Sequence, residues 1–271
     1  MTGLGTALRV ELRKTLTTRM WWILLLVMAL YVLTISAFVA LSFTQAGQAG
    51  APGAPAGPSL DDPAVRLALY TLAMPLAYVF PVLVGTLAIT TEYRYQTLTY
   101  TFLAQPRRAR VLAAKLAVGV AFGLALGVVA VAVGAGGAAG VLALTGNDPG
   151  LDGEVLRALG QTVLGMGLWA ALGVGVGALV RNQVAAIVVV VAFSQLVEPL
   201  LRFGLGAWEA TREVSQYLPG AAGDAMAGAS LYTLGSPVQL LDWWQGGLVL
   251  AAYALVLLAV GGASTVRRDV A

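Results

Sequence analysis

The chain contains no cysteine and no histidine. The absence of cysteine excludes disulfide bonds and thiol catalysis, and the absence of histidine excludes His-ligated metals and Ser-His or Cys-His catalytic pairings. The only lysines are Lys14 and Lys115, and neither follows a glycine, so the chain has no G-x-x-x-x-G-K-[ST] phosphate-binding loop. The chain alone therefore cannot hydrolyse ATP by that mechanism.

Charge is also scarce, since only 11% of the 271 residues are charged and 59% are hydrophobic. A chain of this length cannot bury so much apolar surface in a soluble core, so we predict an all-α integral membrane protein. Six apolar stretches have membrane length: residues 21–41, 66–90, 111–144, 156–180, 184–203 and 243–264. The first stretch is about 20 residues long, which favours a retained span over a cleaved signal sequence.

The charges divide unequally between the two sets of segments that alternate along these spans. One set holds twelve basic and three acidic residues, a net charge of +9, and the other holds four basic and ten acidic residues, a net charge of −6. Basic residues accumulate in cytoplasmic loops, so we expect both termini and the loop 92–110 to be cytoplasmic. This topology explains the overall charge of +3 without nucleic-acid binding.

Two further segments flank the spans. Residues 4–19 carry leucines at every fourth position and basic residues on the other faces, which predicts an amphipathic elbow helix on the cytoplasmic membrane surface, although a plain extension of the first span is the alternative. Residues 204–241 are too polar and too interrupted to span. We expect them to form two short helical pieces of an exterior re-entrant hairpin, covered by protein or by a water-filled cavity.

Small residues and prolines indicate how the spans pack. Glycines recur at intervals of four in the third and fourth spans, at positions 119, 123 and 127, at 136 and 140, and at 173 and 177. Such ridges let helix backbones approach closely in lipid. Pro75 and Pro81 lie inside the second span and should kink it, because each removes a backbone hydrogen bond.

Glu198 is an ionisable residue near the outer end of the fifth span, a position that makes it a candidate functional site. The alternative is that Glu198 lies at the outer water boundary. It is about 15 residues along the fifth span, and a helix of that length extends about 21 Å or a little more, most of the way across the membrane. With Trp208 in the following hairpin, we consider Glu198 a candidate for an exterior gate, and a rigid outer cap is the competing interpretation.

The loop 92–110 begins with Glu92 at the inner end of a span and continues as a short amphipathic segment to a Pro-Arg-Arg turn. Lys115 follows at the start of the next span, where a lysine side chain can reach the interface. Such a charged platform suits the docking of another protein. A basic loop that binds anionic lipid is the alternative, because each nearby Lys or Arg contributes about 1 kcal/mol at an anionic surface.

This loop resembles that of the permease subunits of ABC-2 type transporters, the bacterial exporter class of the type V fold. The family pattern is a Glu, an Arg, a Gly-Thr-Leu-like element, a Pro-x-Arg turn and an Ala-Lys pair. The chain matches it at Glu92, Arg94, Thr97-Leu98, Pro106-Arg107-Arg108 and Ala114-Lys115. It departs at Gln96, where the family usually has Gly, so the geometry at the start of the loop is expected to differ.

The resemblance implies that residues 1–271 form a single ABC-2 transmembrane domain, a half-transporter that works as a homodimer or heterodimer in the bacterial plasma membrane. It also implies two copies of an ATP-binding subunit, which would hold ATP and Mg, while this chain binds no cofactor. The loop 92–110 would be the coupling helix. Its coupling residues would be Glu92, Arg94, Thr97, Pro106, Arg107, Arg108 and Arg110.

Two other functions remain open on the residues alone. An intramembrane aspartyl enzyme would need paired carboxylates at one depth, and the spans show no such pair. An ion-coupled carrier that works without an ATPase would place ionisable groups near the membrane midplane, and the middles of these spans are nearly free of charge. The substrate, whether lipid, drug or peptide, does not follow from the sequence.

Overall fold

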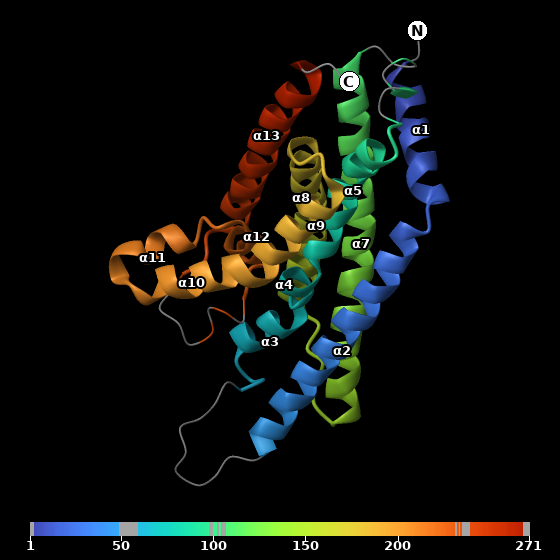
Figure 1. The fold of residues 1–271 in the computed structure, drawn as a ribbon. Helices are drawn as coiled ribbons and strands as arrows, with labels where there is room; N and C mark the ends of the chain where they lie inside the picture. Colours follow the sequence, from blue (N-terminus) through green and yellow to red (C-terminus); the bar gives the residue numbers. More distant parts are fainter. Residues whose placement is uncertain are drawn as a thin grey trace.

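The computed structural model describes residues 3–48, 59–97, 100, 101, 103, 107–230, 232, 234 and 239–267. These residues form helices and connecting segments without any β-strand (Figure 1). Six helical stretches are long and apolar enough to cross a membrane: Met20–Gln45, Pro63–Arg94, Arg108–Leu144, Gly153–Leu179, Gln183–Ala207 and Trp243–Ala263. The six predicted spans are therefore confirmed as helices, with ends that shift by a few residues.

A separate helix precedes the first span. Helix α1 (Leu4–Thr17) is divided from α2 (Met20–Gln48) by Thr18, whose extended backbone, with φ −82° and ψ 150°, ends α1. The leucines at positions 4, 12 and 16 are exposed, while Glu11 is buried. The predicted helix at residues 4–19 is thus present, and its apolar face points away from the bundle.

The second span is broken where its prolines lie. It consists of α3 (Pro63–Tyr70), α4 (Ala73–Ala77) and α5 (Val79–Arg94). Pro75 and Pro81 cannot donate a hydrogen bond to the preceding turn, which interrupts the helical ladder before each of them. The predicted kinks are confirmed, and they separate the buried mid-bundle α4 from the longer α5.

Helix α8 (Gly153–Leu179) is the centre of the bundle, packed against α5, α7 (Arg108–Leu144) and α13 (Trp243–Arg267). The glycines of α8 allow these close contacts: a Cβ on Gly173 would collide with the carbonyl oxygen of Val82, and one on Gly177 would lie 2.5 Å from that of Thr86. Gly123 of α7 faces the backbone of α8 in the same way. At Gly136 and Gly140, nothing from the described residues lies within 4 Å of a Cβ, so the close approach expected of this ridge stays a prediction.

The fifth span changes its helical pitch in the middle. Helix α9 (Gln183–Ala192) leads into a π-helical turn, η1 (Phe193–Val197), and then into α10 (Glu198–Ala207). The wider π turn exposes carbonyl groups. Tyr78 lies at the break between α4 and α5 in the second span, and its hydroxyl donates a hydrogen bond to the carbonyl oxygen of Ser194 in the π turn, at 2.6 Å. In Figure 1, α10 runs across the bundle rather than along α8.

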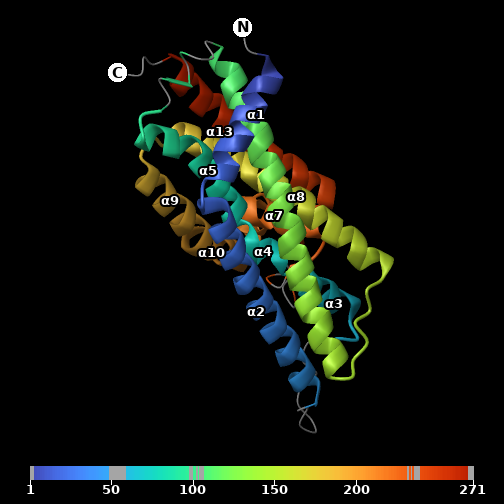
Figure 2. The ribbon, with the colours of Figure 1, turned by 90° about the vertical axis from the view of Figure 1, so that its right-hand side faces the viewer.

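In the described part of the segment between α10 and α13 lie two short helices, while the re-entrant hairpin expected there stays a prediction. Helix α11 (Glu209–Ser215) packs on α10, and α12 (Pro219–Ala227) packs against α13, α8 and α4. Every residue of α12 is buried, and seven of its nine residues are Pro, Gly or Ala, which let neighbouring backbones approach. Helix α12 is therefore part of the core. Figures 1 and 2 both place α1, the C-terminal end of α5 and the N-terminal end of α7 at one end of the bundle, which we call the α1 end.

Candidate functional site

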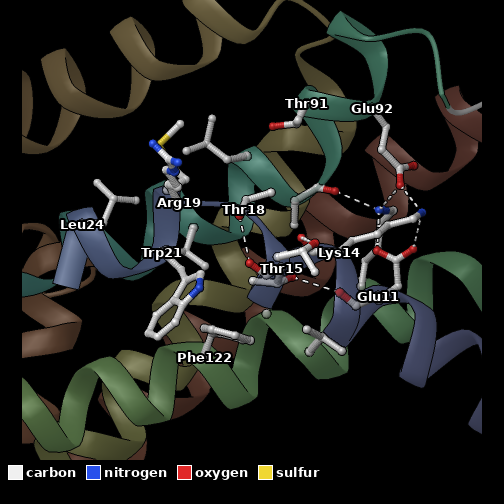
Figure 3. Close-up of a pocket in the computed structure, with 18 of the residues that line it drawn as sticks. Glu11, Lys14, Thr15, Thr18, Arg19, Trp21, Leu24, Thr91, Glu92 and Phe122 are labelled. Atoms are coloured by element: carbon white, nitrogen blue, oxygen red, sulfur yellow. Dashed lines mark hydrogen bonds and ion pairs between the residues drawn. The ribbon is translucent and has the colours of Figure 1, made fainter.

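Four charged side chains meet at the α1 end, and we call Glu11, Lys14, Glu92 and Lys115 the charge cluster. Figure 3 labels the first three of them. The Lys115 ammonium lies 2.7 Å from a carboxylate oxygen of Glu11 and 3.0 Å from one of Glu92. The Lys14 ammonium lies 2.9 Å from Glu11 and 2.5 Å from Glu92. Each carboxylate therefore bridges both lysines, and the cluster is neutral as a whole.

Three separate elements position these groups. Glu11 and Lys14 are three residues apart on α1, so they lie on the same face of that helix. Glu92 is in the last turn of α5, and Lys115 is near the start of α7. The cluster therefore joins α1 to both helices that flank the loop 92–110.

Lys115 is only 3% exposed, so its charge needs close partners. Besides the two carboxylates, its ammonium donates to the Ala88 carbonyl oxygen at 2.8 Å, and these three acceptors compensate for the lost hydration. The expectation that Lys115 extends to the membrane interface is wrong, because a nearer carboxylate pair holds its side chain inside the bundle.

Lys14 is 40% exposed at the edge of the cluster. Burial by itself lowers the pKa of Lys14, but the hydrogen bond to Glu92 and the charges of Glu92 and Glu11 together hold this pKa above its ordinary value of 10.5. A raised pKa means that the folded state favours the protonated lysine. Its contribution to stability is complete below pH 10.5 and is lost only as the pH rises through the higher folded-state pKa.

The chain leaves α5 through a tight helix cap directly after Glu92. Gln96 has a φ of 54°, in the left-handed region, while the Thr97 amide donates to the Glu92 carbonyl oxygen at 3.0 Å and the Gln96 amide donates to that of Tyr93 at 3.2 Å. These two bonds form a Schellman motif. Gly is the usual residue at the left-handed position, and Gln96 adopts the conformation that Gly favours. The expected difference from the family's geometry at Gln96 stays a prediction.

Glu92 is the one predicted coupling residue among the four members of the charge cluster. Arg94 is exposed and lies over the Tyr95 ring at 5.7 Å, and Thr97 and Arg107 are exposed as well. Arg108 and Arg110 are half-buried in the first turn of α7. Pro106 lies outside the described residues.

At the other candidate site, Glu198 is 1% exposed, so protein surrounds its side chain. Its carboxylate accepts the Gly220 amide at the N-terminal end of α12. Trp208, at the opposite end of α10, is 73% exposed. The structure therefore does not bring together the two residues considered for a gate.

Glu198 has different neighbours instead. One turn further along α10, the Arg202 guanidinium lies 2.7 Å from Asp224 of α12, and the Ser230 hydroxyl donates to the same carboxylate at 2.6 Å. Asp224 is 1% exposed. The buried carboxylates of Glu198 and Asp224 therefore join α10 to α12. The count of charged residues in the predicted spans did not indicate this arrangement.

Sequence reasoning missed Glu11 and Lys14 as members of the site. One signal was available: the chain has only two lysines, and both are in the charge cluster. Arg202 and Asp224 were counted only among the charges of the more acidic set of segments, because the sequence did not show that α12 would be buried.

Comparisons with known proteins identify the family. No curated protein matches the chain. A family profile described as ABC-2 family transporter protein matches residues 7–197, well over half of the 271 residues, and this segment contains the whole charge cluster. The six apolar helices agree with this match. The chain belongs to the ABC-2 transporter family and is a multi-pass membrane permease subunit of an ABC transporter, a class whose ATP-binding subunit is a separate partner.

Proposed function

We propose that this permease forms half of the translocation path of an ATP-driven exporter in a bacterial plasma membrane. Two permease copies, identical or related, pair with two ATP-binding subunits, which hold ATP and Mg. The ATP-binding subunits dock at the α1 end, on the loop 92–110. Both termini are cytoplasmic, in agreement with the net charges of +9 and −6 on the two sets of segments.

The charge cluster is the observation that carries this proposal. The loop 92–110 starts at Glu92 and leads into α7, and the two helices that flank it are bonded to each other and to α1 through Glu92, Lys115 and Glu11. A displacement of the loop therefore moves α5, α7 and α1 together. The Schellman motif after Glu92 adds a stiff connection, since it leaves the backbone little freedom between α5 and the loop.

The exterior end supplies a candidate for the gate. Glu198 and Arg202 hold α10 to the buried α12, and Tyr78 holds the π turn to the break in the second span. Mid-helix π turns are frequent at functional sites. We propose that α10 and α12 separate when the path opens to the exterior, and that the exposed Trp208 contacts the exterior membrane surface.

The buried charges of α10 and α12 also favour a second candidate, an ion-coupled carrier, since such carriers bury ionisable groups at span depth. Glu198, Arg202 and Asp224 meet this description. ATP-driven transport agrees better with the family.

Purification of the tagged chain in mild detergent tests the proposal. We expect an ATP-binding subunit to co-purify in a near-equal amount, and reconstituted vesicles should then transport substrate only with ATP and Mg. Transport by the permease alone in response to an ion gradient would favour the carrier instead.

The topology can be tested separately, because the chain has no cysteine. An impermeant thiol reagent applied to intact cells should label Asn147→Cys, in the turn between α7 and α8. Arg107→Cys should react only after the cells are opened. Labelling of Arg107→Cys in intact cells would reverse the proposed orientation.

A further inference from the structure

A pocket of about 690 Å³ lies at the α1 end, between the bend that joins α1 to α2 and the ends of α5, α7 and α9. Figure 3 shows the charge cluster on one side of it and Trp21, Leu24 and Phe122 on the other. Met20 and Ile23 also line the pocket and are exposed on the outer surface of α2. The pocket therefore adjoins an exposed apolar surface of the first span.

The charges of this pocket do not cancel. Its acidic residues, Glu11 and Glu92, are both neutralised by the two lysines of the charge cluster. Arg19 and Arg94 line the pocket as well, are exposed, and form no ion pair with any described residue. Two acidic and four basic groups leave a net charge of +2, which favours an anionic ligand.

The opposite side of the pocket is apolar and aromatic. The Trp21 ring packs edge-on against Phe122, with 6.2 Å between ring centroids, and the Trp21 indole donates to the Leu16 carbonyl oxygen at 3.2 Å. This hydrogen bond holds the indole at the bend between α1 and α2. The result is a preformed apolar surface beside the cationic groups, which is the arrangement required by a ligand with a charged head and a hydrocarbon chain.

Two buried acceptors in the lining lack partners. One carboxylate oxygen of Glu92 and the side-chain carbonyl oxygen of Gln183 are buried and accept no hydrogen bond from the described residues. Both residues line the pocket and are more than nine-tenths buried. A buried acceptor without a donor costs free energy of folding. A ligand that carries hydroxyl groups would donate to both acceptors and remove this cost.

We propose that this pocket binds an anionic phospholipid with a hydroxylated head group, of the phosphatidylglycerol type, from the adjoining membrane leaflet. The phosphate contacts Arg19 and Arg94, the glycerol hydroxyls donate to Glu92 and Gln183, and an acyl chain lies against Trp21 and Phe122. The volume is within the usual range of ligand pockets. The proposed binding of lipid requires no particular transported substrate and no particular direction of transport.

The test uses the full-length chain in phosphatidylcholine nanodiscs with a small fraction of phosphatidylglycerol that carries a photoreactive acyl chain. We expect adducts on peptides that contain Trp21 or Phe122. Excess unlabelled phosphatidylglycerol should suppress them, while phosphatidylcholine and phosphatidylethanolamine should not. Suppression by soluble glycerol phosphate to the same extent would indicate a free phosphate ligand and would overturn the lipid assignment.

Variants make the test specific. The double variant Arg19→Gln/Arg94→Gln should reduce labelling about tenfold or more, because each cation near an anionic surface contributes about a fivefold gain in affinity. Arg9→Gln/Arg13→Gln is the matched control, since it removes the same charge from exposed positions of α1 that do not line the pocket. This control should retain labelling.

A third variant, Thr91→Trp, fills the pocket without changing its charge and should also abolish the adducts. Unfolding midpoints equal to that of the parent chain show that each variant is folded. Equal labelling of the parent chain and the Arg19→Gln/Arg94→Gln variant, or equal competition by phosphatidylcholine, would overturn the proposal.

Discussion

The Lys115 ammonium lies 2.7 Å from a carboxylate oxygen of Glu11, although 104 positions separate the two residues in the sequence. The contact joins α1 to α7 at the point where the loop 92–110 returns to the bundle. Because Lys115 is almost completely buried, this ion pair constrains the helix ends more strongly than a surface pair would.

Lys115→Met should destabilise the protein far more than Lys14→Met. Loss of Lys115 leaves Glu11 and Glu92 buried with only the edge lysine between them, and breaking a buried pair costs about 3–5 kcal/mol. Lys14 is 40% exposed, so its removal should cost about 1 kcal/mol or less. Unfolding midpoints in detergent measure both effects. Equal midpoints for the two variants, or a lower midpoint for Lys14→Met, would contradict the burial of Lys115.

Glu92→Ala should uncouple ATP hydrolysis from transport or dissociate the complex, since it removes the carboxylate shared by both lysines. Removal of one member of a desolvated pair costs about 2–5 kcal/mol. Arg107→Ala, at an exposed position of the same loop, should act mildly and in a salt-dependent way. ATPase activity and transport of the reconstituted complex are the measurements. Wild-type values with normal partner binding in Glu92→Ala would refute the coupling role.

Gln96→Gly should stabilise the permease by about 0.5–1 kcal/mol or somewhat more. Gln96 has a φ of 54°, and a non-glycine residue in the left-handed region costs about 1–2 kcal/mol. Tyr95→Gly is the control, because Tyr95 has a φ of −94° and gains nothing from glycine. A rise of the unfolding midpoint for Gln96→Gly, with a fall for Tyr95→Gly, is expected. A fall for both would show that the left-handed cap is absent in the folded protein.

Gly173→Ala should be strongly destabilising, whereas Gly136→Ala should be neutral or slightly stabilising. A methyl group at position 173 would collide with the carbonyl oxygen of Val82 and force α8 away from α5, at a cost of about 1–3 kcal/mol or more. A methyl group at position 136 meets nothing within 4 Å, and Ala favours the helix. Yield of folded protein and unfolding midpoints distinguish the two. Similar behaviour of both variants would contradict this packing.

Arg202→Met should destabilise the contact between α10 and α12, because Asp224 would remain buried without its cation. The cost of an uncompensated buried charge is about 3–5 kcal/mol. Arg157→Met, at an exposed position of α8 without an ion pair among the described residues, is the matched control. Transport should fall while the ATP-binding subunit still co-purifies. A variant with full transport would leave α12 as a rigid cap without a gating role.

Much of the fold followed from local sequence patterns. The spans, the kinks at Pro75 and Pro81, the separate helix before the first span and the two short helices before the last one were all predicted. Each depends on hydrophobicity, proline chemistry or helical spacing within one segment, and these effects act over short stretches of chain. Glu92 was selected for the same reason, as a charge at the end of a span.

The tertiary structure decided which charges meet. Lys115 was expected at the membrane interface on local grounds, and for Glu198 a candidate gate and the outer boundary both stayed open. Both residues are buried against partners from other helices. The sequence by itself determined that this chain is a membrane protein with six spans, because apolar surface adds up along each segment. It did not determine the charge cluster or the contact between α10 and α12. An ion pair depends on distances of a few ångströms between elements, and only the packing of the helices sets those distances.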